Sequence, residues 1–360
     1  MEYYHSKYGR PRRKKRGLKK WLFILLILVV LAAGAMAYLF WLTFHKSNVW
    51  TTDDTSTSIY ISTGAGFDDV KKELYQHGLI INRKTFEWLA KKKKYDQLVK
   101  PGRYLLYNGM SNLELINILR SGLQTPVKVM FNNLRTKEEL AKKVSEQIEA
   151  DSASIMDLMT DSLFLTDFSI NPDHVEMMFI PNTYEFYWNT DARGFLERMS
   201  KEYNKFWNSS RKEKALRAGL DPWEVVTLAS IVDKETNKTA EMPVIAGVYI
   251  NRLNKNWRLQ ADPTVIYAVG DFSIRRVLKV HTEYESPYNT YLIQGLPPGP
   301  ICISSIASIE SVLNYDDHDY LYFCAKDDFS GYHAFAKTYR QHKKNAKKFQ
   351  EALDRKNIKK

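Results

Sequence analysis

The segment from residue 21 to residue 44, WLFILLILVVLAAGAMAYLFWLTF, contains no charged residue. A helix of this length is about 36 Å long, which exceeds the roughly 30 Å hydrocarbon core of a bilayer. Trp21 and Trp41 lie near its two ends, where aromatic side chains favour the membrane interface. The sequence therefore predicts a single transmembrane helix over residues 21–44.

The charges that flank this segment predict its orientation. The basic run PRRKKRGLKK directly precedes it, whereas only Lys46 follows closely. Because positive charge is retained on the cytoplasmic side, we expect residues 1–20 to form a basic cytoplasmic tail of a single-pass protein of the inner (cytoplasmic) membrane, with residues 45–360 outside. A cleavable signal peptide is the alternative, since residues 35–37 offer an A-x-A site, but the apolar run continues past that site.

The net charge of +12 is concentrated at the two ends of the chain. Residues 1–20 carry nine Lys or Arg and one Glu, and residues 337–360 carry ten Lys or Arg and two acids, a charge of +8 in each case. The body between them has a charge of −4. This distribution argues against a nucleic-acid-binding core, and we expect no nucleic acid among the partners.

Cys302 and Cys324 are the two cysteines of the chain. One disulfide and two unpaired buried thiols are both compatible with their positions. No cluster of His and Cys has the spacing of metal ligands. We expect no metal and no other cofactor.

The exported part is expected to have an α+β fold in two domains. Residues 45–58 are rich in Thr, Ser and Asp and are expected to be a linker. Residues 59–124 alternate between strand and helix patterns; one helix is marked by Ser111 as N-cap, Glu114 three residues later and Gly122 as its stop. Residues 125–345, with a core over 176–342, form the second α+β domain, and residues 346–360 form a basic tail.

The segment ending at residue 235 combines an apolar helix with two acids. Asp221 at the N-cap, Pro222 at the first position and Glu224 at the third predict where the helix begins. At 100° per residue, Asp233 and Glu235 fall on opposite borders of its apolar arc. Periodicity does not choose between them, and pairing with Lys234 and Lys238 or capping of the next helix near Thr239 are structural alternatives.

Several segments together resemble the YceG-like family of endolytic murein transglycosylases. They are FIPNTYEF (179–186), ASIVDKET (229–236), AGVYINRL (246–253), RLQADPTVIY (258–267), YNTYLIQGLPPGPI (288–301), LYF (321–323) and GYHAFAKTYRQH (331–342). The overall plan is also similar, with an N-terminal anchor, a LysM-like module and a catalytic domain. The resemblance implies that residues 59–124 are LysM-like and that residues 125–345 are the catalytic domain.

The resemblance also implies which acid is catalytic. The second acid of the family's E-K-E-T motif is the catalytic one, which corresponds to Glu235. Asp233 stands where the family usually has Glu, which implies a supporting role. Asn182 often corresponds to Asp, Ala261 often corresponds to Ser, and the loop after Pro300 departs from the family's Asn-Pro-Gly-like turn, so a hydroxyl role at Ala261 is not carried over.

The implied reaction is the non-hydrolytic cleavage of the β-1,4 bond between N-acetylmuramic acid and N-acetylglucosamine, with Glu235 as acid and then base. Peptidoglycan glycan strands are the implied substrate, and peptidoglycan synthases at the membrane are implied partners. The candidate substrate-binding residues share polar or aromatic groups suited to sugars: Glu185, Asn251, Gln260, Asp262, Thr264, Tyr267, Tyr288, Asn289, Thr290 and Tyr291.

Two other functions compete with this interpretation. A non-catalytic, membrane-anchored peptidoglycan-binding or scaffold protein would also bind the cell wall. A hydrolytic muramidase would require a second carboxylate beside a water molecule, for which Asp262 and Glu185 are the candidates. Several candidate residues also have structural alternatives, since Asp262-Pro263 is an ordinary helix start and Asn289 an ordinary turn residue.

Overall fold

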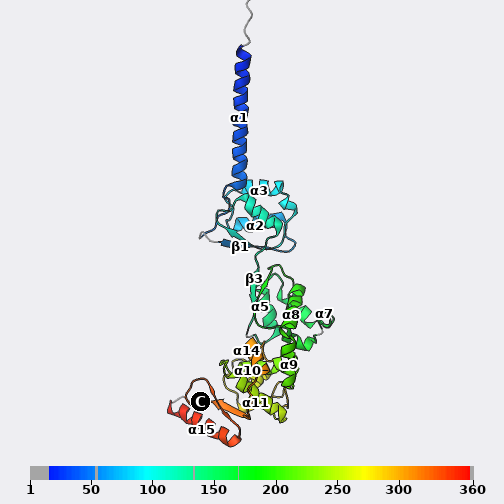
Figure 1. Cartoon of the computed structure of the whole chain (residues 1–360), viewed down its shortest axis with the longest axis vertical. Helices are drawn as coiled ribbons and strands as arrows, with labels where there is room; N and C mark the ends of the chain where they lie inside the picture. Colours follow the sequence, from blue (N-terminus) through cyan, green and yellow to red (C-terminus); the bar gives the residue numbers. More distant parts are fainter. Residues whose placement is uncertain (1–15, 53–55, 133, 169, 357–360) are drawn as a thin grey trace, which may run out of the picture. The chain divides into compact units, whose positions relative to one another are not determined.

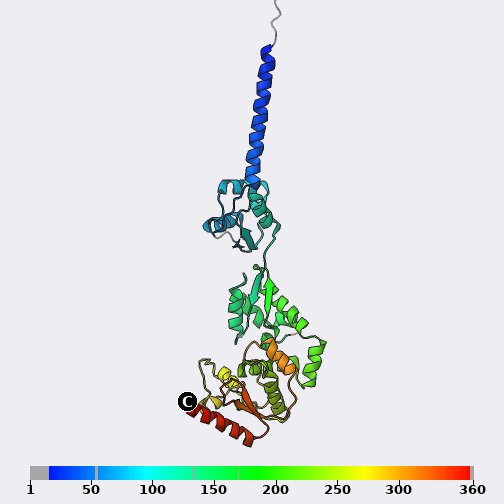
Figure 2. The same ribbon diagram turned by 60° about the vertical axis from the view of Figure 1, so that its left-hand side comes forward.

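The computed structural model describes residues 16–360 except 53–55, 133, 169 and 357–360. Residues 1–15 of the expected tail 1–20 lie outside the described residues, as do residues 357–360 of the expected tail 346–360. The chain divides into two units, Met1–Thr125 and Pro126–Lys360. Each unit mixes helices with short antiparallel strand pairs (Figures 1 and 2), in agreement with an α+β class.

Unit 1 begins with α1 (Arg16–His45). This helix is long and apolar enough to cross a membrane between Lys19 and His45. Its side chains are exposed from Lys19 to Trp41 and become partly buried over the next three residues, where the helix meets the rest of the unit. The helix therefore contains the whole uncharged run 21–44.

The globular part of unit 1 is a small α+β module. Its elements are β1 (Ser56–Ile61), α2 (Phe67–Gln76), α3 (Arg83–Lys92), the 3₁₀ turn η1 (Tyr95–Gln97), β2 (Gly102–Tyr107) and α4 (Asn112–Ser121). Strands β1 and β2 pair antiparallel from Ser56 with Tyr107 to Ile61 with Gly102. Alternate strand residues enter a core with the inner faces of the helices. Strands and helices alternate in this module, as the sequence predicts, while the LysM-like assignment stays a prediction.

Helix α4 shows how local residues set the limits of an element. Ser111 accepts a hydrogen bond from the backbone N–H of Glu114, and the Glu114 carboxylate accepts one from the N–H of Ser111 at 2.8 Å. This reciprocal capping box satisfies donors that a helix start leaves unpaired. Gly122 ends the helix with a φ of 73°, a left-handed conformation that favours glycine. The predicted start and stop of this helix are confirmed.

Residues 45–58 are expected to be a linker, but the first part of this segment belongs to the module. Asn48, Val49 and Thr51 are buried, with exposed fractions of 4%, 1% and 3%. The backbone N–H groups of Asn48 and Val49 donate to the carbonyl of Met110 at 2.8 and 2.9 Å. The polar composition gave no sign of this packing, because the Asn48 side-chain amide donates to the buried Asn112 side chain and accepts from the backbone N–H of Asn82.

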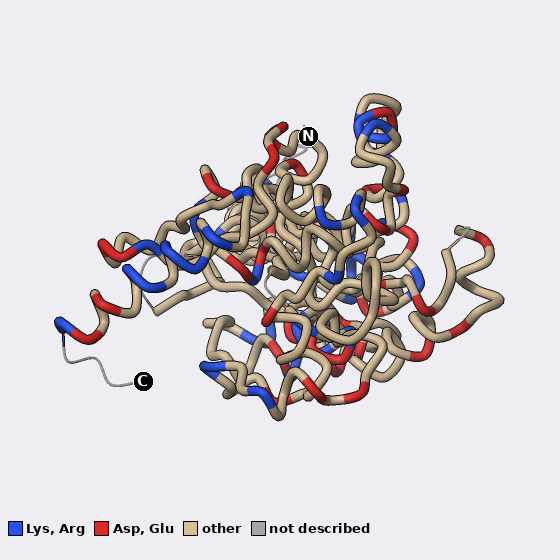
Figure 3. Tube along the Cα trace, turned by 90° about the horizontal axis from the view of Figure 1, so that it is seen from below, with Lys and Arg blue, Asp and Glu red and all other residues tan. Residues whose placement is uncertain are grey.

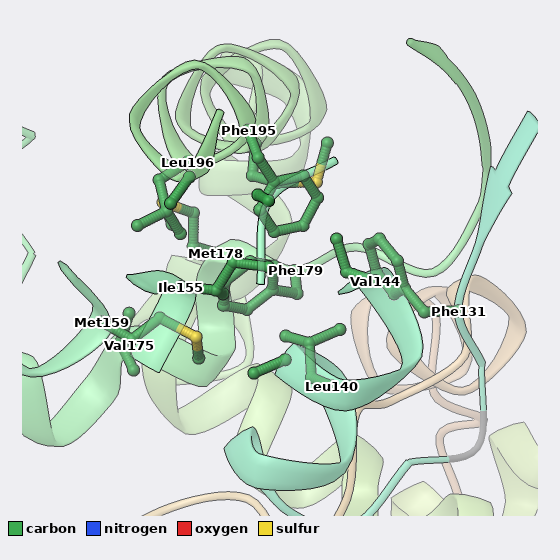
Figure 4. Close-up of a cluster of buried hydrophobic side chains, with 14 of the residues drawn as sticks. Phe131, Leu140, Val144, Ile155, Met159, Val175, Met178, Phe179, Phe195 and Leu196 are labelled. Carbon is green, nitrogen blue, oxygen red and sulfur yellow. The ribbon is translucent and has the colours of Figure 1, made fainter. Parts of the chain in front are cut away.

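The first part of unit 2 is built around one hydrophobic core. Its elements are β3 (Val127–Met130), α5 (Lys137–Ser145), α6 (Ser152–Thr160), α7 (Ser162–Thr166), the 3₁₀ helix η2 (Pro172–Met178), β4 (Thr183–Phe186) and α8 (Ala192–Phe206). Figure 4 shows Phe179 between Phe195 of α8 and Leu140 of α5. Strands β3 and β4 pair antiparallel over this core.

The second part of unit 2 has its own core, in which α10 is central. Helix α10 packs against α9, α11, α12 and α14, and the side chains from Val225 to Val232 are all buried. The elements are α9 (Ser209–Arg217), α10 (Pro222–Glu235), α11 (Met242–Asn254), α12 (Asp262–Val269), α13 (Lys279–Thr282) and α14 (Ile306–Leu313). Because α10 is surrounded in this way, its side chains can reach solvent only near the two ends of the helix.

The chain continues through a hairpin and a basic helix. Strands β5 (Tyr322–Ala325) and β6 (His333–Ala336) pair antiparallel, and α15 (Tyr339–Arg355) packs on both of them. Lys and Arg outnumber the acids along α15, which leads to the C-terminus (Figure 3). Residues 346–355 of the expected basic tail thus lie in a helix, whose Ala352 is buried.

Candidate active site

Glu235 is the last residue of α10. The predicted helix start is confirmed: Asp221 accepts from the N–H of Glu224 at 2.8 Å, the Glu224 carboxylate accepts from the N–H of Asp221 at 2.9 Å, and Pro222 stands at the first position. At the other end Thr236 is extended, which stops the helix at Glu235. The carboxyl group is therefore placed at the end of a buried helix.

Tyr249 of α11 holds the Glu235 carboxyl group. The Tyr249 hydroxyl donates a hydrogen bond to Glu235 Oε1 at 2.6 Å. Tyr249 is buried, with an exposed fraction of 1%, and Glu235 is partly buried. A short bond between two groups that are shielded from water fixes the orientation of the carboxyl group.

Burial raises the pKa of Glu235 to about 7, because the charged form loses its hydration. The hydrogen bond from Tyr249 and the positive charge of Arg252 oppose this rise, whereas the negative charge of Asp262 adds to it. A carboxyl group with a pKa near 7 can both donate and accept a proton at neutral pH. That is the property required of a general acid that later acts as a base.

Asp262 and Tyr291 form a second carboxyl–phenol pair in this region. The Tyr291 hydroxyl donates to Asp262 Oδ1 at 2.6 Å, at the start of α12. Burial, followed by the nearby Asp262 carboxylate, raises the pKa of Tyr291, so the phenol stays protonated. Asp262 is close enough to Glu235 to affect its pKa. Glu235, Asp262 and Tyr291 therefore lie close enough together for the charge of one group to change the pKa of another.

Tyr267 and Tyr288 form an aromatic pair next to a cavity. Their ring centroids are 4.8 Å apart with the planes tilted by 51°. Both line a cavity of about 490 Å³ to which Glu176 and His174 also contribute. Aromatic faces beside polar groups suit the two kinds of surface that a sugar presents.

Three of the expected substrate-binding residues are buried and use their polar groups to hold the backbone. Thr264 Oγ1 and Thr290 Oγ1 are 2.8 Å apart, and Thr290 Oγ1 accepts from the N–H of Ala261 at 3.0 Å. The Asn289 amide donates to the carbonyls of Thr282 and Tyr284. These contacts fix the segment that carries Tyr288 and Tyr291 against the start of α12.

The remaining expected residues lie in three different settings. The Asn251 amide donates to the carbonyls of His318 and Tyr320 at 2.5 and 3.2 Å, which holds the loop before β5. The exposed Gln260 has a φ of 50°, and its N–H donates to the carbonyl of Thr290 at 3.1 Å. Glu185 is exposed on β4, opposite Lys128 of β3, and among the described contacts none joins it to the Glu235 group.

Asp233 is directed away from Glu235. Ser305, the N-cap of α14, donates to Asp233 Oδ1 at 2.5 Å, and Lys234 Nζ lies 4.0 Å from Oδ2. Asp233 also lines a different cavity, of about 450 Å³. The opposite placement of the two acids agrees with the helical periodicity, and the suggested pairing with Lys234 applies to Asp233. Glu235 does not cap the following helix, since α11 begins at Met242.

Several supporting residues were not predicted from the sequence. Glu241 is buried; its Oε1 accepts from the N–H of His333 at 2.7 Å, and its Oε2 lies 2.8 Å from His333 Nδ1. The His333 ring contacts Phe323 edge-on, and Phe323 in turn packs edge-on against Tyr249. The β5–β6 hairpin thus supports the tyrosine that binds Glu235.

Arg252 is a further residue that sequence patterns did not single out. It is 8% exposed, its Nε donates to the carbonyl of Leu321 at 2.8 Å, and its guanidinium group also donates to the carbonyl of Leu259. Arg252, Tyr249 and His333 all lie in segments that carry the family resemblance, which is the signal that could have found them. Among the described residues no group of three or more His, Cys, Asp or Glu is placed to hold a metal ion, and both cysteines are free.

Several known proteins are similar to this chain in sequence or in structure. The endolytic murein transglycosylase of Bacillus subtilis (strain 168) is 29% identical over 311 residues, which cover 82% of this chain and 85% of that protein. The protein of the same name from Streptococcus pneumoniae (strain ATCC BAA-255 / R6) is 28% identical over 322 residues, and the match covers 80% of this chain and 57% of the pneumococcal protein.

A solved structure and a family model are similar to this chain as well. The crystal structure of a yceG-like protein from Listeria monocytogenes matches with a TM-score of 0.55 and 26% identity, covering 81% of this chain and 99% of that chain. The model of the YceG-like family matches residues 59–348, a range that contains most of the module of unit 1 as well as Glu235 and Tyr249. This chain therefore belongs to the YceG-like family.

Proposed function

We propose that this protein is a membrane-anchored, endolytic peptidoglycan lytic transglycosylase. It cleaves the β-1,4 bond between N-acetylmuramic acid and N-acetylglucosamine and leaves 1,6-anhydro-N-acetylmuramic acid ends. The observation that carries the proposal is the Glu235 carboxyl group, oriented by Tyr249 at 2.6 Å and with its pKa raised to about 7. Family membership and the names of the relatives support the same substrate.

The mechanism uses one carboxyl group twice. Protonated Glu235 donates its proton to the glycosidic oxygen while the bond from that oxygen to C1 of the muramyl residue breaks. The ionised carboxylate then takes the proton of the muramyl C6 hydroxyl, whose oxygen attacks C1 and closes the anhydro ring. Glu235 ends protonated, and no water is consumed.

The surrounding residues have distinct proposed parts. Tyr249 stabilises the ionised Glu235 between the two steps, because a hydrogen bond to a carboxylate favours its charged form. Asp262 and Tyr291 face the positive charge that develops at C1 or bind sugar hydroxyls. Tyr267 and Tyr288 pack on sugar faces beside the cavity that they line. The cleft is shaped by Asn251, Gln260, Thr264, Asn289 and Thr290. Glu185 contacts a longer glycan strand.

Helix α1 and its flanking charge support the proposed location. Helix α1 spans the cytoplasmic membrane once, the basic residues before it keep the N-terminus in the cytoplasm, and unit 2 lies on the outer side. Cell-wall glycan is present on that side. Anchoring places the cut near newly made strands, where peptidoglycan synthases are the proposed neighbours.

The test is product analysis with purified sacculi. Glu235→Gln keeps the size and the acceptor oxygen of the side chain but cannot transfer a proton. We expect it to fold, bind sacculi and release no anhydro-muropeptides. Near-normal release by this variant would show that Glu235 is not the catalytic acid. Sacculus binding with no products from the wild type would instead support the scaffold alternative.

A muramidase is the second candidate, because Asp262 lies near enough to Glu235 to influence its pKa. In that mechanism Asp262 would activate water, and reducing-end sugars would form. Asp262→Asn therefore separates the two functions. The transglycosylase keeps forming anhydro products in this variant, whereas a muramidase would lose its reducing-end products.

A further inference from the structure

The end of α1 is joined to the module of unit 1 by a buried amide network. The Asn48 side chain donates to Asn112 Oδ1 at 2.6 Å and accepts from the N–H of Asn82 at 2.7 Å. The Asn112 side chain donates to the carbonyl of Thr43, within α1, at 3.1 Å. Buried amides with all partners in place resist separation. The helix and the module are therefore connected without a spacer.

This connection determines how far the module lies from the membrane. About 20 residues of helix cross a hydrocarbon core, so a span that begins at Trp21 leaves the core near Phe40. The following residues lie among lipid headgroups, and Asn48 is already inside the module. If α1 spans the membrane, as the proposed function holds, the adjoining surface of the module lies against the headgroups.

Helix α3 occupies this surface. It contacts α1, and the ring of Trp88 meets that of Phe44 at a centroid distance of 6.1 Å and an angle of 83°. Figure 1 shows α3 beside the end of α1 that joins the module. Helix α4 also packs on α1.

The exposed side of α3 combines apolar and basic residues at helical spacing. Ile81 is 64% exposed and Trp88 is 44% exposed, and Lys84 and Lys92 are exposed between and beyond them. Lys84, Trp88 and Lys92 are four residues apart on α3 and so share one face, and Ile81 directly precedes Asn82, the N-cap of the helix. A tryptophan flanked by lysines is typical of helices that lie in a membrane interface.

Neighbouring charged residues do not neutralise the positive charge of this face. Glu87 is turned toward α2, where it accepts from the Tyr75 hydroxyl at 2.8 Å. The hydrogen bond and charge of Lys71, and to a smaller extent the charge of Lys91, lower the pKa of the Asp68 carboxyl group on α2, so Lys91 is directed toward α2 rather than toward this face. The remaining face is basic.

A cavity of about 310 Å³ lies where α1 meets the module. Leu39, Leu42 and Ile81 give it an apolar side, and the amides of Asn48 and Asn112 and the hydroxyl of Thr85 give it a polar one. Among the described residues that line it, Lys46 carries a charge and none is acidic. A phospholipid is complementary to this arrangement, because its apolar acyl chains are joined to an anionic phosphate group.

We propose that Ile81, Lys84, Trp88 and Lys92, together with the cavity beside Lys46, bind anionic phospholipids of the outer leaflet. Trp88 and Ile81 enter the interface, and the lysines pair with phosphate groups. Zwitterionic lipids match this surface less well, because each lysine near an anionic surface gains attraction that a neutral surface does not supply. The contact orients the module, and the amide network passes that orientation to α1.

The test uses the full chain in nanodiscs of phosphatidylglycerol or of phosphatidylcholine. Lysines are labelled with an amine reagent that does not cross membranes, and each site is quantified by mass spectrometry. We expect labelling of Lys84 and Lys92 to fall at least about threefold in phosphatidylglycerol, and to recover at high salt. Lys344 and Lys348, exposed on α15, serve as internal references whose labelling does not change.

A charge-reversal variant provides the matched comparison. K84E/K92E should abolish the dependence of Trp88 quenching by brominated lipids on lipid charge, whereas K344E/K348E, with the same change in net charge, should keep it. Subtracting the signal of Trp88→Phe isolates this residue from the other tryptophans. Equal quenching of Trp88 in both lipids by the wild type would overturn the lipid contact.

The outcomes separate this inference from the proposed function. A chain that shows the expected labelling but releases no anhydro-muropeptides supports the lipid contact and refutes the activity. A chain that releases them yet labels identically in both lipids refutes the lipid contact alone. Failure of the chain to enter nanodiscs would refute the spanning of α1 and the lipid contact with it.

Discussion

The Tyr249 hydroxyl donates to Glu235 Oε1 at 2.6 Å, and this bond joins the end of α10 to the middle of α11. The ring of Tyr249 is held by the edge of Phe323 from the β5–β6 hairpin. Three separate parts of unit 2 therefore determine where one carboxyl group points. Burial favours the protonated form of that group and the tyrosine favours the ionised form, so its pKa reflects a balance between the two.

Tyr249→Phe should move the alkaline limb of the pH–activity profile to higher pH. Without the hydroxyl, the charged form of Glu235 loses its hydrogen bond and its pKa rises above about 7. The acid step needs protonated Glu235, so activity persists to a pH about one unit higher. The maximal rate should fall, because the ionised carboxylate is less stable between the two steps. Anhydro-muropeptide release measured from pH 5 to pH 9 checks both effects.

Asp262→Asn should shift the alkaline limb of the pH–activity profile in the opposite direction. It removes a negative charge that raises the pKa of Glu235, so the same limb should move to lower pH. The amide can still accept from Tyr291, which preserves the contact seen at 2.6 Å. Limbs that shift in the same direction in both variants would contradict this electrostatic account.

Local patterns predicted the elements but not the contacts between them. The starts of α4 and α10 followed from side chains within four residues of each helix end, Ser111 with Glu114 and Asp221 with Glu224. Helical periodicity also placed Asp233 and Glu235 on different sides. It could not show which acid is catalytic, a role that the family resemblance assigned to Glu235, and neither source predicted the contact with Tyr249.

The remaining features depend on residues far apart in the sequence. Glu241 meets His333 across 92 positions, and Asn48 meets Asn112 across 64. No local pattern reports such pairs, because they form only when the cores have packed. For the same reason, residues such as Asn289 and Thr290 looked suited to sugar hydroxyls, although the structure shows their polar groups bonded to backbone or to a neighbouring threonine.

Glu235→Gln should stabilise unit 2 increasingly as the pH rises. The pKa of Glu235 is about 7 in the folded protein and near 4.5 when unfolded. Between these values the folded state binds more protons, so the wild type loses stability with rising pH, and the loss is complete above pH 7. The variant lacks this titration. Its advantage should be absent at pH 4 and on the order of 3 kcal/mol at pH 8.

Thermal unfolding at several pH values measures this difference. Glu283→Gln is the matched control, since Glu283 is 62% exposed beside Lys279, and it should show no comparable gain. A Glu235→Gln midpoint that parallels the wild type at every pH would mean that burial of the carboxyl group costs no stability.

Gly247→Ala should destabilise unit 2 although alanine favours helices. Gly247 lies inside α11, and a Cβ there would stand 2.5 Å from the carbonyl oxygen of Asp316 and 2.9 Å from His318 Nε2. The backbone oxygen cannot move away cheaply, because the N–H of Asp316 donates to the carbonyl of Pro243, and His318 Nε2 lies 2.9 Å from the carbonyl of Val244. Overpacking costs about 1–3 kcal/mol, more than the gain of about 1 kcal/mol in helix propensity.

For Gly247→Ala we therefore expect a lower unfolding midpoint together with weaker activity, since the displaced loop also binds Asn251. Gly66→Ala, where the new Cβ would meet Asp69 at an ordinary 3.8 Å, should change the midpoint far less, and a Gly247→Ala midpoint at or above that of the wild type would show that the loop does not depend on this close approach.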